Sequence, residues 1–545
     1  MKKSFPFINL QSAFTRNLLF FFILAALAWS YRYWEILFLR PSSVHQWRQT
    51  DCLSLADNYY EGEWNLFKPT LHLLFSDGET TGKSAGEFPI LYYVVGILWK
   101  IFGKHEFIFR LLTIAISFAG MYALFRLAYA LLKSFFWAMS TVILLFSSPI
   151  YAFYTNNFLI NVPAFSLMLI ALWYFYLFWQ SGRNTQLYKA LFFFAWVGLF
   201  KISTLMTLVV IGFIYASEVF GFLKFKRDGK VFKEPLKQGV AFGVMMAVVA
   251  SWYLYTNHYN AVHGGKYTLN YIQSYWASSL DQIHSSLKSL RNFIVFQVLS
   301  IPTFLYLILC LCYLGMNFRK LDLVWKVAIP LFLIGYYCFV MLFFYSLDSH
   351  DYYHVDFLIV PIVIHLAFLH YLKKNETSWF HSGLTKLFFS AFLLYNVLYC
   401  ANNMRMRYWG PGEKPMYTAQ LIAPKIDVEN WAYFHWVYRN KPYETVTPVL
   451  RSMGIKRSDA VVCPDDFSYS ITLYLMDQKG WTNMETTLKD SLAIIDRVRH
   501  GAKYMMIADT AIKKVPFLVT FEQHELMNYQ GLHIYDLRPF ATSKK

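Results

Sequence analysis

The residues best suited to chemistry lie in one acid-rich segment near the N-terminus. Residues 40–87 hold seven Asp or Glu, whereas the 295 residues from 107 to 401 hold nine. In the run 45–51, His-Gln-Trp-Arg-Gln-Thr-Asp, Arg48 and Asp51 share a face if the run is helical. An Arg beside an Asp can keep the carboxylate ionised while offering its guanidinium to a phosphate. The segment therefore indicates acid–base chemistry or cation binding.

A second acid of this segment, Glu87, stands directly before Phe88 and Pro89 at the start of an apolar run. Both acids also have a structural explanation. Arg48 and Asp51 could form a surface ion pair, and a carboxylate at a helix start is favoured by the helix dipole. Spacing alone leaves these alternatives open. For the other acids of the segment we expect a solvated loop: Asp57, Glu61, Glu63, Asp77 and Glu79.

These residues must be positioned by a membrane-embedded scaffold. The 545-residue chain is 57% hydrophobic and 15% charged, with a mean hydropathy of +0.34, whereas soluble domains average about 25% charged residues. Its apolar blocks of about 20 residues are long enough to cross a hydrocarbon layer. We expect an α-helical polytopic membrane protein with about 11–13 transmembrane helices. The predicted spans are 18–39, 107–132, 135–153, 158–179, 188–200, 203–222, 238–256, 294–316, 327–346, 355–372 and 384–401.

Lys and Arg cluster in every second connection between the apolar blocks, and such clusters mark the cytoplasmic side. Lys2, Lys3 and Arg16 favour a cytoplasmic N-terminus, so that residues 40–87 lie outside. The span from 107 also starts outside. A further apolar block, 88–103, therefore cannot be a simple crossing, and it lies along the membrane or dips in and returns. The outer face then carries four loops: 40–106, 154–157, 257–293 and 347–354.

The C-terminal region is polar and has another organisation. Strand-like runs alternate there with helical patterns, such as 491–501. We predict a membrane domain over 1–401, a linker over 402–424 and an extracytoplasmic small α/β domain over 425–545. The six cysteines have neither the spacing of a disulfide framework nor that of a zinc site.

The order of these features resembles the GT-C glycosyltransferases, in the branch around the protein O-mannosyltransferases and the aminoarabinose transferase of lipid A. The resemblance covers most of residues 1–401, and we find none for 402–545. It implies a membrane enzyme that transfers a sugar from a polyprenyl-phosphate carrier to a lipid, glycan or protein acceptor on the outer face. It rests on the first helix and its acid-bearing loop, then on Glu87-Phe88-Pro89, Phe102-Gly103, Glu106-Phe107 with Arg110-Leu111, residues 154–163, Gly198-Leu199-Phe200-Lys201 and His350-Asp351-Tyr352-Tyr353.

Such a reaction needs a base for the acceptor proton and cationic groups for the phosphate leaving group. The resemblance implies Asp51 as the base, poised by Arg48, and inversion at the anomeric carbon. Glu87 would position the acceptor or bind a divalent cation, while Lys201 and Arg110 would contact the phosphate. A lipid donor also explains why the sequence has no Gly-rich phosphate loop.

Further residues complete the predicted site. Asn161 stands where relatives usually carry Asp or Glu, and since an amide cannot act as a base, this departure allows altered or weak activity. A divalent metal ion held by Glu87, His258 and His263 is an alternative; otherwise we expect no cofactor. The remaining substrate-binding residues are predicted to be His45, Gln49, Asn161, His350, Asp351, Tyr352 and Tyr353.

Other functions fit parts of the sequence. A secondary transporter predicts ionisable residues at mid-membrane and two repeated halves, but the predicted spans are nearly free of acids and no repeat shows. An outer-leaflet polysaccharide polymerase or ligase is closer in chemistry, and a non-catalytic membrane protein stays an alternative. The net charge of +17 lies in short clusters between apolar blocks, which does not indicate nucleic-acid binding. We expect a bacterial inner-membrane protein with its site and C-terminal domain on the periplasmic side.

Overall fold

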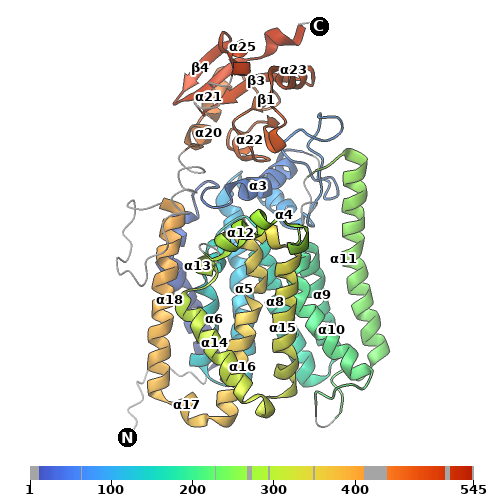
Figure 1. Cartoon of the computed structure of the whole chain (residues 1–545), viewed down its shortest axis with the longest axis vertical. Coiled ribbons are helices and arrows are strands. Elements are labelled where there is room, and N and C mark those ends of the chain that lie inside the picture. Colours follow the sequence, from blue (N-terminus) through green and yellow to red (C-terminus); the bar gives the residue numbers. More distant parts are fainter. Residues whose placement is uncertain are drawn as a thin grey trace.

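The computed structural model describes residues 12–62, 64–226, 229–266, 273–291, 295–347, 350–409, 439–509 and 516–542. A bundle of long helices carries a small α/β domain at one end (Figure 1). We call this end of the bundle the domain end and the opposite one the far end. The predicted architecture, a polytopic helical membrane protein with a small C-terminal α/β domain, is confirmed.

The bundle helices follow the predicted spans in order. In the described residues, eight helices are long and apolar enough to cross a membrane, where α10 and α16 count together with the 3-10 turns before them (Ile202–Val219 and Asp351–Asn375). The pair α6 and α7, bent by 79°, makes a ninth if it is one span. Two more, α9 and α14, have 17 and 16 residues and are short for a span. The bounds are α1 (Ala13–Ser30), α5 (Glu106–Leu132), α6 (Phe135–Phe146), α7 (Pro149–Thr155), α8 (Asn161–Ser181), α9 (Asn184–Phe200), α10 (Met206–Val219), α11 (Pro235–His263), α14 (Ile301–Met316), α15 (Leu323–Leu342), α16 (Ile359–Asn375) and α18 (Gly383–Trp409).

The first predicted span, 18–39, has the wrong bounds. Helix α1 ends at Ser30, and Arg32 then takes a left-handed conformation with φ 58° before the short helix α2 (Tyr33–Ile36). A left-handed residue interrupts the right-handed helix. Hydropathy continues past this break, and the prediction therefore overran the helix end.

Two shorter helices occupy the domain end of the bundle (Figure 1): α3 (Gln46–Glu61) and α4 (Ile90–Phe102). Arg48 Nη2 of α3 lies 2.6 Å from Oε1 of Glu87, which precedes α4. Asp57 Oδ1 of α3 lies 2.8 Å from Nζ of Lys104, which follows α4. Both ends of α4 are thus held on α3. The predicted block 88–103 thus forms a 13-residue helix at the domain end, and its orientation in a membrane stays a prediction.

The C-terminal domain is built on a five-stranded sheet in the order β2-β1-β3-β5-β4. The first three strands in that order are parallel, and β5 and β4 are antiparallel additions. The strands are β1 (Ala460–Cys463), β2 (Gly480–Thr482), β3 (Ala502–Ile507), β4 (Glu525–Tyr529) and β5 (Leu532–Asp536). The helices are α20 (Lys441–Thr445), α21 (Thr447–Ser452), α22 (Ile471–Leu475), α23 (Ser491–Arg499) and α25 (Val519–Glu522).

The predicted linker, 402–424, begins as a helix. Helix α18 continues through residues 402–409 and ends at Trp409. The rest of the predicted linker lies outside the described residues.

Backbone pairing joins the α/β domain to the loop that carries α3. Gly480, at the start of edge strand β2, donates its N–H to His72 O at 3.1 Å and accepts from Leu74 N at 2.8 Å. The loop thereby covers this edge of the sheet, which would otherwise expose unpaired backbone groups. Gly is required at this position, because a Cβ would lie 1.9 Å from Val461 O. The domain and α3 are therefore held in a defined relative position.

Candidate active site

The predicted catalytic run, residues 45–51, lies at the start of helix α3, and its charged side chains are buried in the protein interior. Arg48 is 9% exposed and Asp51 is fully buried, so the alternative of a surface ion pair between them is excluded. His45 adopts a left-handed φ of 57° directly before the helix. Gln49 Nε2 donates to Ser42 O at 2.7 Å and braces this entrance turn. Gln49 therefore has a structural role rather than the predicted substrate contact.

Glu87 joins two cationic side chains from different parts of the chain. Its Oε1 lies 2.6 Å from Arg48 Nη2 on α3 and 4.0 Å from Nζ of Lys201, which follows α9. Burial raises the pKa of Glu87, but the positive charges of Arg48 and Lys201 outweigh this effect and hold the pKa below its ordinary value. The three side chains together carry one net positive charge, which suits an anionic ligand.

Asp51 has a different environment. Neither of its carboxylate oxygens has a hydrogen-bond partner in the described part of the chain. Burial, which Arg48 offsets in part and Asp466 and Glu87 reinforce, raises the pKa of Asp51 to about 8. A buried carboxylate without partners is costly, and strongly shifted pKa values gather at functional sites. Asp51 is thus the strongest candidate for a proton acceptor.

Asp351 ties several elements to the entrance of α3. One carboxylate oxygen lies 3.2 Å from His45 Nε2 and accepts the Tyr154 hydroxyl, while the other lies 2.8 Å from Arg407 Nη2. Arg407 also donates to Gln297 Oε1 at 2.8 Å. Because both oxygens of Asp351 are engaged, this residue anchors His45 and is poorly placed to act as a base.

Asp356 controls the segment that carries Lys201. Its carboxylate accepts the hydroxyl of Thr204 at 2.9 Å and also that of Ser203. Both hydroxyls belong to a short 3-10 helix, η1 (Ile202–Leu205), which directly follows Lys201. The buried Asp356 therefore fixes the turn that aims Lys201 at Glu87.

Aromatic rings surround these charged groups. The rings of His45 and His350 stack with centroids 5.7 Å apart, and Trp47 meets His350 edge-on at 5.6 Å. Lys201 Nζ lies 4.6 Å from the centre of the Tyr353 ring. The predicted residues that the structure connects through these contacts are His45, Arg48, Glu87, Lys201, His350, Asp351 and Tyr353, with Asp51 one turn along α3.

Two other predicted residues serve the scaffold. Arg110 is fully buried and donates to the carbonyls of Asn156 and Leu39. This geometry assigns it a structural role in place of the predicted phosphate contact. Asn161 Nδ2 donates to the backbone carbonyl of Tyr352 at 3.2 Å. A carboxylate at position 161 would lack this donor, which gives the departure at Asn161 a structural explanation.

The predicted metal ligands Glu87, His258 and His263 are not brought together. Glu87 is engaged by two cations, His258 is exposed, and His263 Nδ1 lies 2.7 Å from Asp77 Oδ1. Among the described residues, the side chains that lie close enough together to hold a metal ion form a different group. This set does not fit a metal ion.

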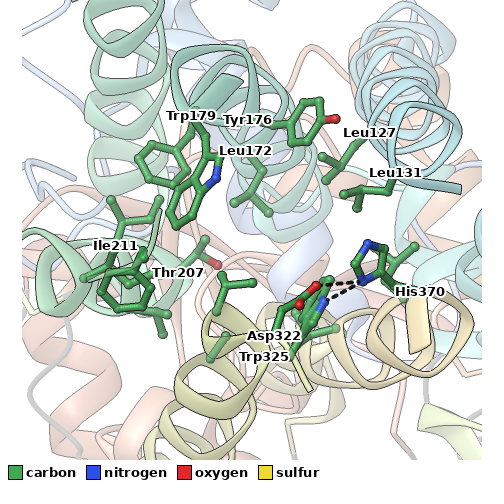
Figure 2. Close-up of a pocket in the computed structure, with 18 of the residues that line it drawn as sticks. Leu127, Leu131, Leu172, Tyr176, Trp179, Thr207, Ile211, Asp322, Trp325 and His370 are labelled. Carbon is green, nitrogen blue, oxygen red and sulfur yellow. Dashed lines mark hydrogen bonds and ion pairs between the residues drawn. The ribbon is translucent and has the colours of Figure 1, made fainter. Parts of the chain in front are cut away.

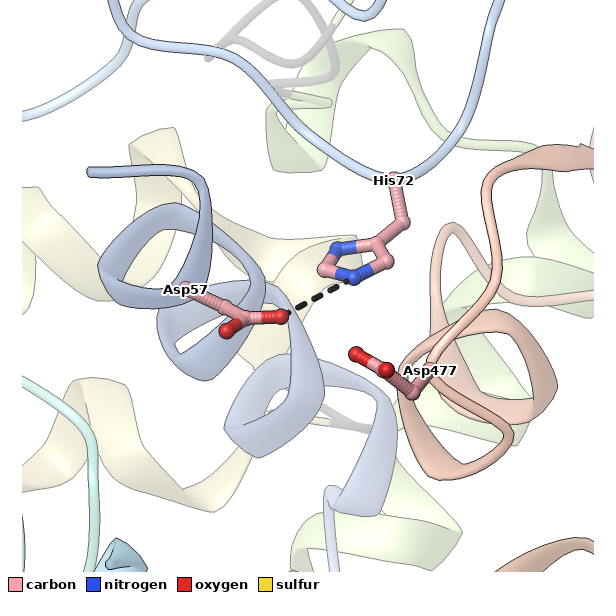
Figure 3. A group of neighbouring side chains, drawn as sticks. All are labelled: Asp57, His72 and Asp477. Carbon is pink, nitrogen blue, oxygen red and sulfur yellow. Dashed lines mark ion pairs between the residues drawn. The ribbon is translucent and has the colours of Figure 1, made fainter. Parts of the chain in front are cut away.

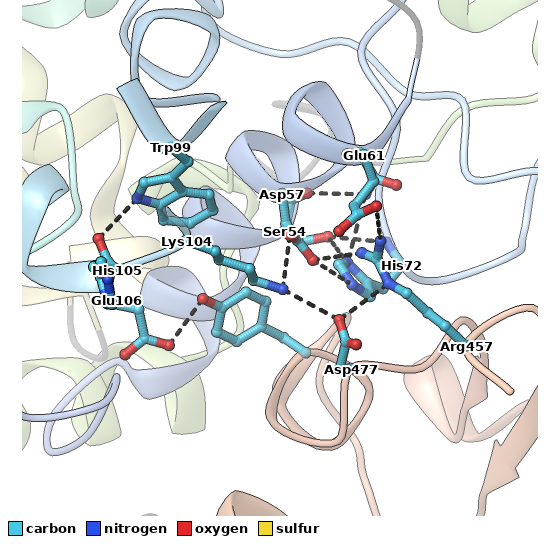
Figure 4. Close-up of polar contacts among 12 residues, drawn as sticks. Ser54, Asp57, Glu61, His72, Trp99, Lys104, His105, Glu106, Arg457 and Asp477 are labelled. Carbon is cyan, nitrogen blue, oxygen red and sulfur yellow. Dashed lines mark hydrogen bonds and ion pairs between the residues drawn. The ribbon is translucent and has the colours of Figure 1, made fainter. Parts of the chain in front are cut away.

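The group with metal-like spacing is Asp57, His72 and Asp477, whose candidate ligand atoms lie within 4.8 Å of one another (Figure 3). Lys104 and Arg457 already contact both carboxylates, at 2.7–3.1 Å (Figure 4). A metal cation here would be repelled by two positive charges at close range. We assign the group as an ion-pair network that joins the α/β domain to α3.

Sequence reasoning missed Asp356 and Arg407. Asp356 is one of only nine acids between residues 107 and 401, and this rarity was a usable signal. Arg407 lies beyond residue 401, where the predicted membrane domain ends and the predicted linker begins. Its contact with Asp351 depends on α18 continuing past that boundary.

Comparison with known proteins identifies similar folds. Residues 86–255 match the family model described as dolichyl-phosphate-mannose-protein mannosyltransferase. The structure is similar to that of ArnT from Cupriavidus metallidurans in the apo state, with a TM-score of 0.56 and 11% identity, over 98% of this chain and 100% of the other. This likeness shows that the chain shares the fold of ArnT. The resemblance inferred from the sequence motifs is confirmed at this level.

Two further solved structures are similar in fold. ArnT from Cupriavidus metallidurans bound to undecaprenyl phosphate gives a TM-score of 0.55 at 10% identity, over 98% of this chain and 100% of the other. The Archaeoglobus fulgidus oligosaccharyltransferase in complex with Zn and sulfate gives a TM-score of 0.51 at 10% identity, over 88% of this chain and 67% of the other. No curated protein matches the sequence. The coverage of 98% extends the likeness to ArnT into the C-terminal domain, for which the sequence showed no family.

Proposed function

We propose that this protein transfers a sugar from a polyprenyl-phosphate carrier to a lipid, glycan or protein acceptor, with inversion at the anomeric carbon. The site lies at the domain end of the bundle, which we place at the periplasmic face of a bacterial inner membrane. One observation carries the proposal above all others. Asp51 is a fully buried carboxylate without a hydrogen-bond partner among the described residues, one helical turn from Arg48.

Asp51 acts as the general base. The acceptor hydroxyl attacks the anomeric carbon, its proton passes to the Asp51 carboxylate, and the bond between that carbon and the carrier phosphate oxygen breaks. Attack opposite the leaving group inverts the anomeric carbon. A carboxylate whose pKa is raised to about 8 takes this proton more readily than an ordinary one.

Arg48 and Lys201 stabilise the departing phosphate. They approach the same oxygen of Glu87 from two separate elements, and their summed charge exceeds that of Glu87 by one. Preorganised cations that face developing negative charge are among the largest contributions to enzymatic rate. Glu87 therefore holds the two cations in place, and this replaces acceptor positioning as its main role.

The lipid nature of the donor is supported by the comparisons. ArnT has been solved with undecaprenyl phosphate, and the matching family model is described by a dolichyl-phosphate donor. Both molecules are polyprenyl phosphates. The net positive group at the domain end fits the phosphate that they share.

A turnover assay with the purified full-length protein tests this function. Radiolabelled polyprenyl-phosphate sugars are mixed with a membrane extract that supplies acceptors, and label in new products is measured. The variants are Asp51→Asn and Glu87→Gln, with Asp281→Asn, an exposed acid of helix α12 (Leu280–Ser289), as the matched control.

We expect the wild type and Asp281→Asn to release label from the carrier, and Asp51→Asn to lose at least about 100-fold in rate, in the range of a lost general base. Wild-type activity in the Asp51→Asn protein would remove Asp51 as the base. Absence of transfer from any donor by the wild type, with labelled carrier still bound, would replace the transferase by a binding or transport function. A product with retained configuration would contradict direct displacement.

A further inference from the structure

A large cavity lies away from the candidate active site. It has a volume of about 720 Å³ and opens among α5, α8, α10, α15 and α16 (Figure 2). Volumes of this size are typical of small-molecule and cofactor sites. Lys224 lines the cavity and is exposed, so we call the end around Lys224 the mouth. Chain direction places this end at the far end of the bundle, because α10 starts near Lys201 at the domain end and Lys224 follows the other end of that helix.

The walls of the cavity are apolar along its length. Leu172 of α8, Ile211 of α10, Phe332 of α15 and Ile362 of α16 are among the residues that line it. Its charged, amide and histidine side chains instead belong to segments at the far end: Gln180, Lys224, Lys226, Asp322 and His370. A ligand that satisfies this arrangement has a long apolar part and a polar group at the far end.

The mouth is positively charged. Lys224 is exposed and forms no ion pair within the described residues, and Lys226 Nζ donates to the neutral carbonyl of Trp179. The one acid of the mouth, Asp322, is already balanced by Lys374, whose Nζ lies 2.5 Å from its carboxylate. Lys224 and Lys226 thus offer their charge to a ligand.

We propose that this cavity binds an anionic phospholipid of the leaflet at the far end. Its acyl chains lie between α10, α15 and α16, and its phosphate meets Lys224 and Lys226. Basic residues beside a membrane attract anionic lipids of the cytoplasmic leaflet, and the charge pattern of the sequence places the far end there. This site is distinct from the proposed donor phosphate site, because Lys201 and Arg48 lie at the opposite end of the bundle.

The test uses the full-length protein reconstituted in detergent, with native mass spectrometry and thermal unfolding as readouts. Three lipids are titrated: phosphatidylglycerol, phosphatidylethanolamine with the same acyl chains, and a polyprenyl phosphate. The variants are Lys224→Ala/Lys226→Ala and Ala328→Phe, which fills the cavity from α15. A control, Lys237→Ala/Lys386→Ala, removes the same charge from two lysines that do not line the cavity.

We expect the wild type to retain phosphatidylglycerol at one molecule per protein and to bind it more tightly than phosphatidylethanolamine. The double variant should bind phosphatidylglycerol about 30-fold more weakly, the effect of two lysines at a charged lipid surface, while the control should match the wild type. Ala328→Phe should weaken both phospholipids.

Equal affinity of the double variant and the control would overturn the proposal. So would equal affinity of the wild type for the two phospholipids. If only the polyprenyl phosphate occupies the cavity, and Lys201→Met abolishes its binding while Lys224→Ala/Lys226→Ala does not, the cavity belongs to the donor chain and no separate phospholipid site exists. None of these outcomes depends on turnover, so failure here is distinguishable from failure of the proposed transferase.

Discussion

Arg48 Nη2 lies 2.6 Å from Glu87 Oε1, although the two residues are 39 positions apart. Arg48 belongs to α3, whereas Glu87 precedes α4. Lys201 approaches the same oxygen at 4.0 Å. The two cations are held close together by one buried carboxylate. Any change at Glu87 therefore acts on both groups that would contact the phosphate.

Replacing Glu87 by Gln should weaken catalysis through these cations. The neutral amide keeps one acceptor but removes the charge that offsets Arg48 and Lys201, so the two cations should separate. We expect kcat/KM to fall by about 100-fold, in the range seen when a preorganised stabilising group is lost. Steady-state kinetics with the lipid donor measures this effect.

The control for this variant is Asp77→Asn, another acid of the same loop, whose ion pairs with His263 and Lys83 do not involve α3. It should keep near wild-type kinetics. If both variants lose the same activity, loop structure in general and not the Arg48–Glu87–Lys201 contact is responsible.

The raised pKa of Asp51 predicts opposite effects of pH on activity and on stability. With a pKa of about 8, roughly one-tenth of the Asp51 side chains are ionised at pH 7 and about nine-tenths at pH 9. Because the base must be ionised, the initial rate should rise across this interval. A rate that stays flat from pH 7 to pH 9, with chemistry rate-limiting, would exclude Asp51 as the titrating base.

Stability should change in the other direction. The folded state binds the Asp51 proton more tightly than the unfolded chain, whose Asp pKa is about 3.9. The resulting stability is fully present below pH 4 and is lost as pH rises through 8. Asp51→Asn lacks this dependence, so it should become increasingly more stable than the wild type between pH 5 and pH 8. Thermal unfolding of both proteins across this range measures the difference in stability. If the Asp51 carboxylate were ionised throughout, this difference would stay constant with pH.

The sequence was sufficient to locate most of the helices, but not the contacts around Asp51, whose role as the base stays a prediction. Hydropathy located the apolar blocks because burial in lipid requires long runs of apolar residues. Charge parity predicts that 88–103 does not cross the membrane, and this stays a prediction; the structure shows that the residues flanking α4 are held on α3. The shared oxygen of Glu87 is a tertiary contact between residues 48, 87 and 201, and no local pattern encodes it.

Misassigned residues follow the same logic. Arg110 was predicted to contact phosphate from its charge and its place near a helix end, yet its guanidinium donates to backbone carbonyls of other segments. A lone buried cation can either bind a phosphate or hold backbone carbonyls in place, and only its hydrogen-bond partners distinguish the two roles. The metal set failed likewise, because His263 and Glu87 each have a nearer charged partner.

Asp356 should affect catalysis only through Lys201. Asp356→Ala removes the acceptor of both hydroxyls in η1, so the turn after Lys201 is released, and we expect an increase of about tenfold in KM for the donor with a smaller change in kcat. Asp356→Asn keeps an acceptor and should recover part of the loss. In a Lys201→Met background, Asp356→Ala should have no further effect on KM, because coupled residues are not additive. Additive losses would show that Asp356 acts by another route.

The ion-pair network between α3 and the α/β domain should be a stability element. Asp57 is fully buried, and although burial raises it, His72, Lys104 and Arg457 hold the pKa of Asp57 below its ordinary value. Arg457→Ala leaves a buried charge with one partner fewer, so the free energy of unfolding should fall by about 3 kcal/mol. Because the pKa is depressed, the stability that Asp57 contributes is present above pH 4 and is lost as pH falls. Differential unfolding of wild type and variant at pH 7 measures the loss.

A matched control separates this network from ordinary surface pairs and from a metal site. Lys503→Ala breaks an ion pair with Asp459 inside the same domain, but the Lys503 side chain is 50% exposed, and exposed pairs contribute about 0–1 kcal/mol. The unfolding midpoint of Lys503→Ala should therefore stay close to that of the wild type. If a bound metal ion held Asp57, His72 and Asp477, a chelator would destabilise the wild type as much as Arg457→Ala does. We expect the chelator to leave the wild type unchanged, because Lys104 and Arg457 already supply the positive charge that the two carboxylates require.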